Sequence, residues 1–244
     1  MIIDDSHYDI IIIGSGAGGG TLAGSLSREG RSVLLLERGE AVEAGWQKRP
    51  RVKDEVWFGP DGDPFSPQTF YALGGNTKIW GAVLERMREK DFTDLPLQEG
   101  VSPAWPFDYN HLAPYYEQAE AIYRVHGKAG VDPTEPTRSK GFDQSPRPVM
   151  PFLAELREGL LRQGCQPYDL PLSWSDNEES PVGDAELCGL ATADTGNLEI
   201  RYKARALRLH VSPSGREVKK VEADVNGEIW LFSSDLVVLA AGAI

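Results

Sequence analysis

Apolar and polar positions follow different periods along the chain, and the pattern is clearest near the N-terminus. Residues 10–13 are four consecutive isoleucines that lead into the glycine-rich residues 14–19. Such an apolar run favours a strand covered on both faces, as parallel strands are. Helical spacing follows in Ala17, Leu22, Ala23 and Leu26, with Gly30 at the position of a C-terminal cap. Residues 32–36 then supply a second strand, so the pattern predicts strand, turn, helix and strand.

Two further helices are predicted in the middle of the chain. Asp108 or Asn110 caps the first, with Pro114 tolerated in its first turn. Its apolar positions are Leu112, Tyr116, Ala119, Ile122 and Tyr123. The second begins after Pro151 and ends before Gly164. We expect it to bury Phe152, Leu153, Leu156 and Leu160. Residues 40–70, 128–150 and 171–187 are rich in proline, glycine or polar groups and are predicted to be irregular or loop-like.

The period changes to that of strands after Asn197. Short strands are predicted at residues 198–202, 204–211, 218–225 and 228–232. Turn chemistry separates them, and Asn226-Gly227 is a strong hairpin signal. A last apolar strand at residues 235–244 ends in small residues, which suit close approach by a ligand or helix. The pattern therefore predicts several short strands joined by turns, followed by a closing apolar strand.

Composition narrows the possible classes of protein. The 244 residues are 41% hydrophobic and 25% charged, as in ordinary globular proteins. A formal net charge of -12 argues against nucleic-acid binding, and no apolar run approaches the ~20 residues of a membrane span. Cys165 and Cys188 lack metal-ligand spacing and are expected to be reduced thiols. The N-terminus resembles no secretion signal, so the cytoplasm is the expected location.

The first glycines suit a nucleotide-binding turn. Gly14 permits the tight turn out of the strand, Gly16 lets the backbone approach a pyrophosphate, and Gly19 lets the helix lie close to the sheet. Glu37 follows Gly19 by 18 positions, near the ~20-residue spacing of a carboxylate that binds ribose hydroxyls. Such a unit serves FAD or NAD, and both remain open at this point.

Several further segments carry a family resemblance. Residues 37–39 are Glu-Arg-Gly, and residues 74–82 are Gly-Gly-Asn-Thr-Lys-Ile-Trp-Gly-Ala. Residues 105–120 contain Trp-Pro, Pro-Tyr-Tyr and Ala-Glu, and residues 239–244 are Leu-Ala-Ala-Gly-Ala-Ile. In this order the segments resemble the glucose–methanol–choline oxidoreductases, in their FAD-binding N-terminal portion.

The resemblance implies a fold and a set of cofactor-binding residues. The fold is α/β: a Rossmann-like FAD/NAD(P)-binding domain with a β-meander and an incomplete, helical and loop-rich substrate side. Residues 1–45 plus 198–244 would form the FAD-binding domain, and residues 46–197 the flavin-proximal loop and an insertion. The implied FAD-binding residues are Gly14, Ser15, Gly16, Ala17, Gly19, Glu37, Arg38, Gly75, Asn76, Thr77, Gly81, Ala82, Ala206, Ala241 and Gly242. For Ala206, a contact with the adenine and the role of a plain strand alanine are both open.

The implied activity is hydride transfer from the CH–OH group of an alcohol or sugar to flavin N5. Some relatives bind the flavin covalently through a histidine, but that position is Ile79 here, so we expect non-covalent FAD. Only eight residues separate Cys188 from Asn197, fewer than in many relatives. The family's catalytic histidine and its partner lie in a C-terminal half that these residues do not include. We therefore expect no catalytic residue in this chain, and a possible partner chain that supplies that half.

Individual residues leave alternatives open. His7, His111, His126 and His210 lack the setting of a tuned base and are expected to be ordinary surface or partly buried histidines. Trp80 suits either stacking near the flavin or a core position. Lys78 is expected to be a solvated loop lysine, with stabilisation of an anionic flavin as the alternative. The competing functions are a nucleotide-binding module without catalysis and an NAD-dependent dehydrogenase.

Overall fold

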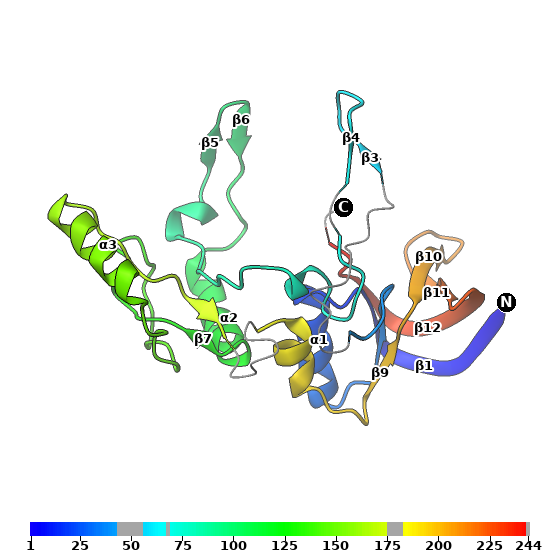
Figure 1. Cartoon of the computed structure of the whole chain (residues 1–244). Coiled ribbons are helices and arrows are strands. Elements are labelled where there is room, and N and C mark those ends of the chain that lie inside the picture. Colours follow the sequence, from blue (N-terminus) through cyan, green and yellow to red (C-terminus); the bar gives the residue numbers. More distant parts are fainter. Residues whose placement is uncertain (43–55, 67–68, 175–182, 243–244) are drawn as a thin grey trace. The chain divides into compact units, whose positions relative to one another are not determined.

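The described residues form two compact units. In the computed structural model (Figure 1), residues 1–42, 56–66, 69–174 and 183–242 are described. Residues 1–80 and 184–244 make up the first unit, and residues 81–183 the second. The predicted FAD-binding domain, residues 1–45 plus 198–244, lies within the first unit, which also takes in residues 46–80 and 184–197. Ala243 and Ile244, at the end of the predicted closing strand, lie outside the described residues.

A six-stranded mixed sheet organises the first unit. Its order is β10-β11-β12-β1-β2-β9. Four neighbouring strands are parallel: β12 (Glu228–Leu239), β1 (Ile2–Ile13), β2 (Val33–Leu36) and β9 (Leu198–Arg201). β11 (Val218–Val225) pairs antiparallel with β12, and β10 (Ala204–Val211) pairs antiparallel with β11 at the edge of the sheet. The predicted α/β class and the β-meander are confirmed.

The last two predicted strands are in fact one. β12 runs without a break from Glu228 to Leu239, although separate strands at residues 228–232 and 235–244 were expected. Residues 228–232 pair antiparallel with β11, and residues 230–239 pair parallel with β1. One extended strand therefore serves both neighbours, and no turn is needed at Ser233 or Ser234.

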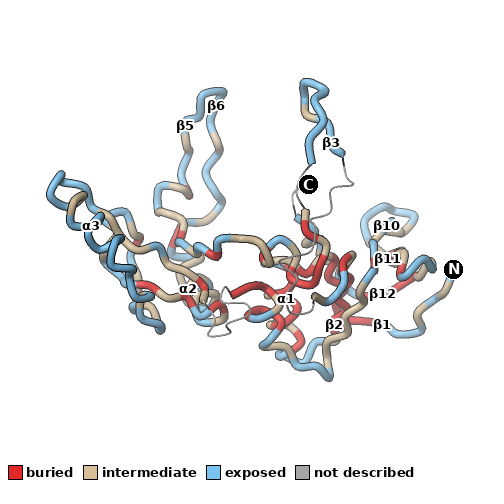
Figure 2. Tube along the Cα trace, viewed as in Figure 1, coloured by how far each residue is buried: buried red, intermediate tan, exposed pale blue. Residues whose placement is uncertain are grey.

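The core fills both faces of the sheet. Ile11 and Ile13 pack with Leu34, Leu36 and Phe232 on one face. Ile10 and Ile12 pack with Ala23, Val33 and Leu35 on the other. Figure 2 shows this burial concentrated around β1 and β2. Each fully buried aliphatic side chain contributes about 1.5–3 kcal/mol, so the covered isoleucine strand is a main source of stability.

The helix α1 (Ala17–Arg28) covers part of the sheet and ends where the sequence predicts. Gly30 has φ +86°, in the left-handed region that favours glycine. Its N–H donates to the Ser27 carbonyl at 3.0 Å, and the Arg31 N–H donates to the Leu26 carbonyl at 3.1 Å. These two bonds satisfy carbonyls that the helix end leaves open. The predicted cap at Gly30 is confirmed.

Short elements complete the first unit. β3 (Trp57–Phe58) and β4 (Pro64–Phe65) form a small hairpin within residues 40–70, which were predicted to be irregular. A 3₁₀-helix spans Gly75–Lys78. The segment predicted as a loop at residues 171–187 contains most of a short π-helix, Ala185–Gly189, which a 3₁₀-turn at Leu190–Thr192 follows. The π-helix and the 3₁₀-turn after it pack against α1, and the Gly75–Lys78 helix packs against the π-helix, so local composition alone did not reveal them.

The second unit contains two helices and small strand pairs. Its elements are a 3₁₀-helix (Glu89–Phe92), β5 (Leu95–Leu97), β6 (Gly100–Ser102), α2 (Tyr109–Ile122), β7 (Val125–His126), α3 (Pro151–Arg162) and β8 (Leu172–Ser173). Asp108 caps α2, and its carboxylate accepts the His111 N–H. Because α2 begins at Tyr109, Pro114 lies in its second turn, not in the predicted first turn. The missing N–H of Pro114 leaves the Asn110 carbonyl without its helical donor.

A buried ion network lies inside the second unit. The Nε and Nη2 atoms of Arg86 each donate to a different carboxylate oxygen of Glu120 at 2.8 Å. Arg138 Nη2 donates to the same carboxylate at 2.6 Å. Arg86 Nη1 donates to the Tyr109 hydroxyl at 2.9 Å. Tyr109 and Glu120, which belong to the family-like segment at residues 105–120, therefore hold α2 to Arg86.

The helix α3 differs from the prediction in its burial. Its bounds agree, but Phe152 is 61% exposed and Leu156 is 55% exposed, and no residue of the helix is buried. Figure 2 shows α3 as an exposed segment. Helical spacing of apolar residues predicts the helix, whereas burial needs a covering element, and the described residues of this unit supply none.

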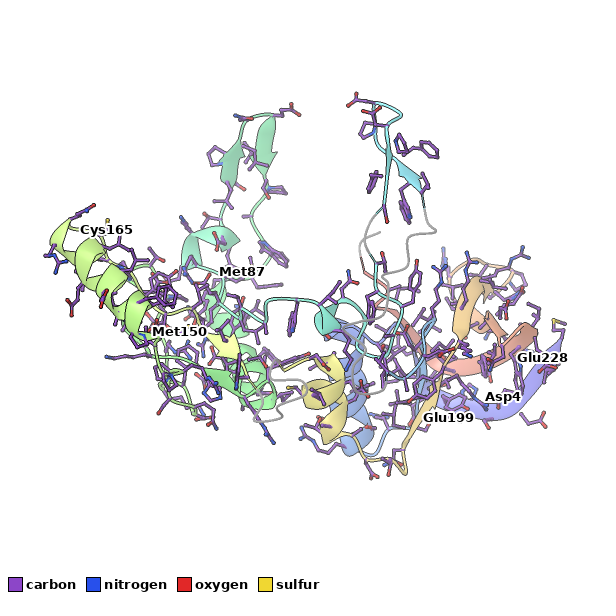
Figure 3. The ribbon with its side chains drawn as sticks, in the orientation of Figure 1. Asp4, Met87, Met150, Cys165, Glu199 and Glu228 are labelled. Atoms are coloured by element: carbon purple, nitrogen blue, oxygen red, sulfur yellow. The ribbon has the colours of Figure 1, made fainter. Side chains whose placement is uncertain are left out.

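The ionisation of Tyr8 in β1 makes the stability of the sheet depend on pH. Its hydroxyl donates to the Glu199 carboxylate at 2.7 Å, and Tyr8 is 6% exposed. Burial, the bond to Glu199 and the negative charge of Asp4 raise the pKa of Tyr8 well above its usual value of about 10. Figure 3 labels Asp4 and Glu199 on β1 and β9. The protonated Tyr8 hydroxyl stabilises the folded state. This contribution is fully present below the pKa of Tyr8 in the unfolded chain and is lost as the pH rises through its higher pKa in the folded protein.

We therefore expect the free energy of unfolding to fall as the pH rises above about 10. Denaturant midpoints measured between pH 8 and 11 check this result. Tyr8→Phe removes the ionisable hydroxyl and should flatten part of that decline. An identical decline in both proteins would contradict the assignment to Tyr8.

Among the described residues, no helix combines the length and the apolar character needed to cross a membrane.

Candidate functional site

The glycine turn between β1 and α1 is built from three close contacts. Gly14 has φ +97°, and its N–H donates to the Leu36 carbonyl at 2.9 Å. A side chain at Gly14 would place its Cβ 2.6 Å from the Ala240 carbonyl oxygen, and one at Gly19 would overlap the Gly14 carbonyl. The Cβ position of Gly16, by contrast, meets no atom within 4 Å. Gly14 and Gly19 therefore close the turn, whereas Gly16 faces open space at the start of α1.

Glu37 binds back onto this turn. Glu37 is only 5% exposed. One carboxylate oxygen accepts the N–H of Ser15 at 3.1 Å and the Ser15 hydroxyl, and the other accepts the N–H of Gly39 at 2.7 Å. A carboxylate offers about four acceptor positions, so three protein donors leave about one for a ligand hydroxyl. The ribose contact of Glu37 stays a prediction.

The second glycine loop lies against the first. The N–H of Gly74 donates to the Ser15 hydroxyl oxygen at 3.0 Å, and the Cβ position of Gly75 is 3.5 Å from the Cα of Gly16. Inside the loop, the Asn76 carboxamide oxygen accepts the Phe70 N–H at 2.7 Å. The Thr77 hydroxyl donates to the Gly74 carbonyl at 2.6 Å. The structure thus brings residues 14–19, Glu37 and residues 74–77 into one site.

The end of β12 adds a third segment. The Ala240 N–H donates to the Ile13 carbonyl at 2.8 Å, so this segment continues alongside β1. The Cα of Ala241 lies 3.0 Å from the Cβ position of Gly14, and Gly242 has φ +86°. The small residues at the end of the closing strand do permit close approach, as the sequence predicts.

The other predicted site residues have the following surroundings. Arg38 lies over the Tyr71 ring, with its guanidinium carbon 3.9 Å from the ring centroid. Ala206 pairs with Ala223 and packs against the core, so its contact with an adenine stays a prediction. Gly81 and Ala82 belong to the second unit. There Ala82 is buried with φ +53°, and its carbonyl accepts the Ser173 N–H at 2.9 Å.

The surroundings of Lys78 differ from those that the sequence predicts. Its side chain is 5% exposed, and its Nζ lies 2.9 Å from Asp184 and 2.5 Å from Glu186. The expected solvated loop lysine is therefore a buried cation between two carboxylates. The acidic residues after position 183 gave no local sign that they meet the second glycine loop.

The four histidines have local partners outside this site. His111 contacts its helix cap Asp108, His126 the Ser145 carbonyl, and His210 the Glu222 carboxylate. His7 lies between Ser233 at 3.0 Å and Asp235 at 2.9 Å. The side chains of His7 and Asp235 are 57% and 75% exposed, so water surrounds this trio. In the first unit, the hydrogen-bond partners of His7 and His210 do not belong to the glycine turn.

The two cysteines are free thiols in the structure. Cys188 is buried, and Cys165 is exposed just beyond the end of α3 (Figure 3).

Comparisons with known proteins find relatives that align with most of this chain. No family model matches the chain. The chain is 30% identical to 6'''-hydroxyparomomycin C oxidase of Streptomyces lividus, over 86% of this chain and 43% of that protein. It is 32% identical to paromamine 6'-oxidase of Streptomyces fradiae, over 85% and 42%. It is 24% identical to oxygen-dependent choline dehydrogenase of Staphylococcus xylosus, over 97% and 46%.

Solved structures share the fold. Pyridoxine 4-oxidase from Mesorbium loti superimposes with a TM-score of 0.66 at 21% identity, over 98% of this chain and 50% of that one. An FAD-dependent oxidoreductase from Chaetomium thermophilum gives 0.65 at 16% identity, over 97% and 46%. The chain thus spans less than half the length of the curated relatives that it matches. These relatives are oxidases and a choline dehydrogenase, and the similarity over most of the chain is consistent with the N-terminal portion of a glucose–methanol–choline oxidoreductase.

Proposed function

We propose that the chain binds FAD non-covalently and forms the cofactor-binding portion of an oxidoreductase that acts on CH–OH groups. The observation that carries this proposal is the union of the two glycine segments. Gly74 donates to Ser15, Ser15 donates to Glu37, and Gly75 lies next to Gly16. A simple NAD-binding turn does not need the second segment, which the family resemblance assigns to the flavin side of FAD.

The residues of the turn suit the anionic part of FAD. Gly16 precedes α1, and its Cβ position is open. The first N–H groups of a helix lack intrahelical acceptors and, together with the helix dipole, favour a pyrophosphate. Glu37, with about one acceptor position left, would take a ribose hydroxyl. These features fit the adenosine and pyrophosphate part of FAD.

The flavin, when bound, supplies the chemistry of hydride acceptance, and the chain supplies binding and orientation. Ile79, at the end of the Gly75–Lys78 helix, has no nucleophile for a covalent link. The names of relatives such as choline dehydrogenase and paromamine 6'-oxidase support the hydroxyl of an alcohol or sugar as the substrate class.

We propose that a base outside the glycine site removes the proton from the substrate hydroxyl. His7 and His210 contact partners in the first unit that do not belong to that site, and His111 and His126 contact partners within the second unit. A base, and most of the substrate pocket, would come from further polypeptide, in the same protein or in a partner chain. Without it, the chain acts as a nucleotide-binding module.

Reconstitution tests the proposal. The purified chain, incubated with FAD and desalted, should keep a flavin absorbance band, and acid precipitation should release all flavin into the supernatant. Addition of alcohols or sugars should leave the band unbleached. Flavin in the precipitate would disprove non-covalent binding, and bleaching by the chain alone would disprove an external base. Retention of NAD in place of FAD would favour the dehydrogenase alternative and overturn the proposal.

A further inference from the structure

We propose that Lys78, held between Asp184 and Glu186, is a positioning residue that sets the second glycine loop on the nucleotide turn and thereby controls FAD affinity. The part that concerns affinity rests on the proposed function. The part that concerns the loop does not.

The burial of this cluster makes its geometry specific. The side chains of Lys78 and Asp184 are 5% and 2% exposed, and that of Glu186 is 30% exposed. Removing an ammonium group from water is strongly unfavourable unless an opposite charge lies close to it. Lys78 therefore has one favourable place, between the two carboxylates, and the loop that carries it is fixed accordingly.

Asp184 joins this lysine to a second element. One of its carboxylate oxygens accepts the N–H groups of Glu186 at 2.8 Å and Leu187 at 3.0 Å, and so caps the π-helix Ala185–Gly189. The other oxygen accepts from Lys78. One carboxylate thus connects the glycine loop to the start of this helix.

The π-helix rests on α1. The Cβ position of Gly20 is 3.1 Å from the Cβ of Ala185, and a side chain at Gly24 would overlap the Gly189 carbonyl. At Gly189, an added Cβ would lie 2.9 Å from the Thr21 backbone nitrogen. Small residues on both sides permit this contact. Because α1 also carries the nucleotide turn, the π-helix has a fixed position relative to that turn.

Thr77 makes a second connection between the glycine loop and the π-helix. Its hydroxyl oxygen accepts the Ala185 N–H at 2.9 Å, and its hydroxyl donates to the Gly74 carbonyl. Gly74 in turn donates to Ser15. Thr77 and Lys78 therefore tie the end of the Gly75–Lys78 helix to residues 184–185, and Gly74 ties its start to the nucleotide turn. Residues 184–189 therefore position the loop that we assign to the flavin side.

Removal of the Lys78 charge should loosen this arrangement. Lys78→Met leaves two carboxylates without their shared cation, and their repulsion and hydration draw residues 184–186 away from the loop. We expect amide exchange in residues 69–80 and 183–190 to rise at least about tenfold, with β1 and β12 unchanged. The dissociation constant for FAD, from quenching of flavin fluorescence, should rise at least about tenfold. Lys78→Arg, which keeps the charge, should recover most of the affinity.

Two variants serve as controls. Lys219→Met removes a lysine from an exposed pair with Glu217, with side chains 56% and 62% exposed, and should change neither measurement. Asp184→Asn keeps the oxygen that caps the π-helix but weakens the contact with Lys78. It should act in the same direction as Lys78→Met, and it replaces that variant if the methionine protein fails to fold.

The outcomes separate this inference from the proposed function. Unchanged exchange in the loop for Lys78→Met and Asp184→Asn would overturn the positioning role. Increased exchange with FAD affinity within twofold of the unmodified chain would overturn the control of affinity. If the unmodified chain binds no FAD, the proposed function fails, and loop exchange alone decides the positioning role.

Discussion

Gly19→Ala is expected to destabilise the first unit by about 3 kcal/mol or more, at the upper end of overpacking costs. The added Cβ would overlap the Gly14 carbonyl and lie 3.1 Å from the Ala240 Cβ. The Gly14 carbonyl cannot move easily, since the N–H of the same residue is bonded to Leu36 at the end of β2. The helix must shift instead, and its N-terminal N–H groups then leave the turn. Denaturant unfolding should show the loss of stability, and desalting after incubation with FAD should show loss of the cofactor.

Gly18→Ala is the matched control in the same helix. No atom lies within 4 Å of its Cβ position. Alanine is a better helix former than glycine, so this change should stabilise the unit by about 0.5–1 kcal/mol. The two variants should be compared without FAD, so that any contact of position 18 with the cofactor does not enter. Equal stability of the two variants would show that the close approach of Gly19 to Gly14 is not limiting.

Glu120→Ala is expected to destabilise the second unit by about 3–5 kcal/mol. The Glu120 carboxylate accepts from both Arg86 and Arg138, whose side chains are 2% and 7% exposed. Its removal leaves two largely buried guanidinium groups without their common counter-charge. Hydrogen exchange should show loss of protection in α2, while β1 and β12 of the first unit keep theirs.

Glu158→Ala is the control for this variant. Glu158 pairs with Arg162 across 3.8 Å, with side chains 72% and 74% exposed. An exposed pair of this spacing contributes about 0.3–0.5 kcal/mol, so the loss should be no larger than that. A small effect of Glu120→Ala, similar to that of Glu158→Ala, would contradict the role assigned to the buried network.

The network also explains the family-like segment at residues 105–120 in physical terms. Tyr109 donates to the Thr137 carbonyl and accepts from Arg86, and Glu120 accepts from two arginines. Both residues work inside the second unit, as structural partners. In the sequence this segment carried the resemblance without showing what its residues do.

Local features of the fold followed from the sequence. The isoleucine strand, the helix that ends at Gly30, and the bounds of β10 and β11 all agree with the structure. Each depends on the period of apolar residues or on turn chemistry within a few positions, which the sequence contains directly. The continuity of β12 did not follow, because it depends on two neighbouring strands at once.

The candidate site divides in the same way. The sequence by itself determined the glycines that permit the turn and the second loop, since only glycine accepts such φ angles and contacts readily. The tertiary structure alone decided that Glu37 binds Ser15, that α3 remains exposed, and that Lys78 is buried beside Asp184, 106 positions away. The physical reason is that burial and charge pairing depend on which distant segments meet. Local propensity fixes the segments themselves, and packing decides which side chains they bring together.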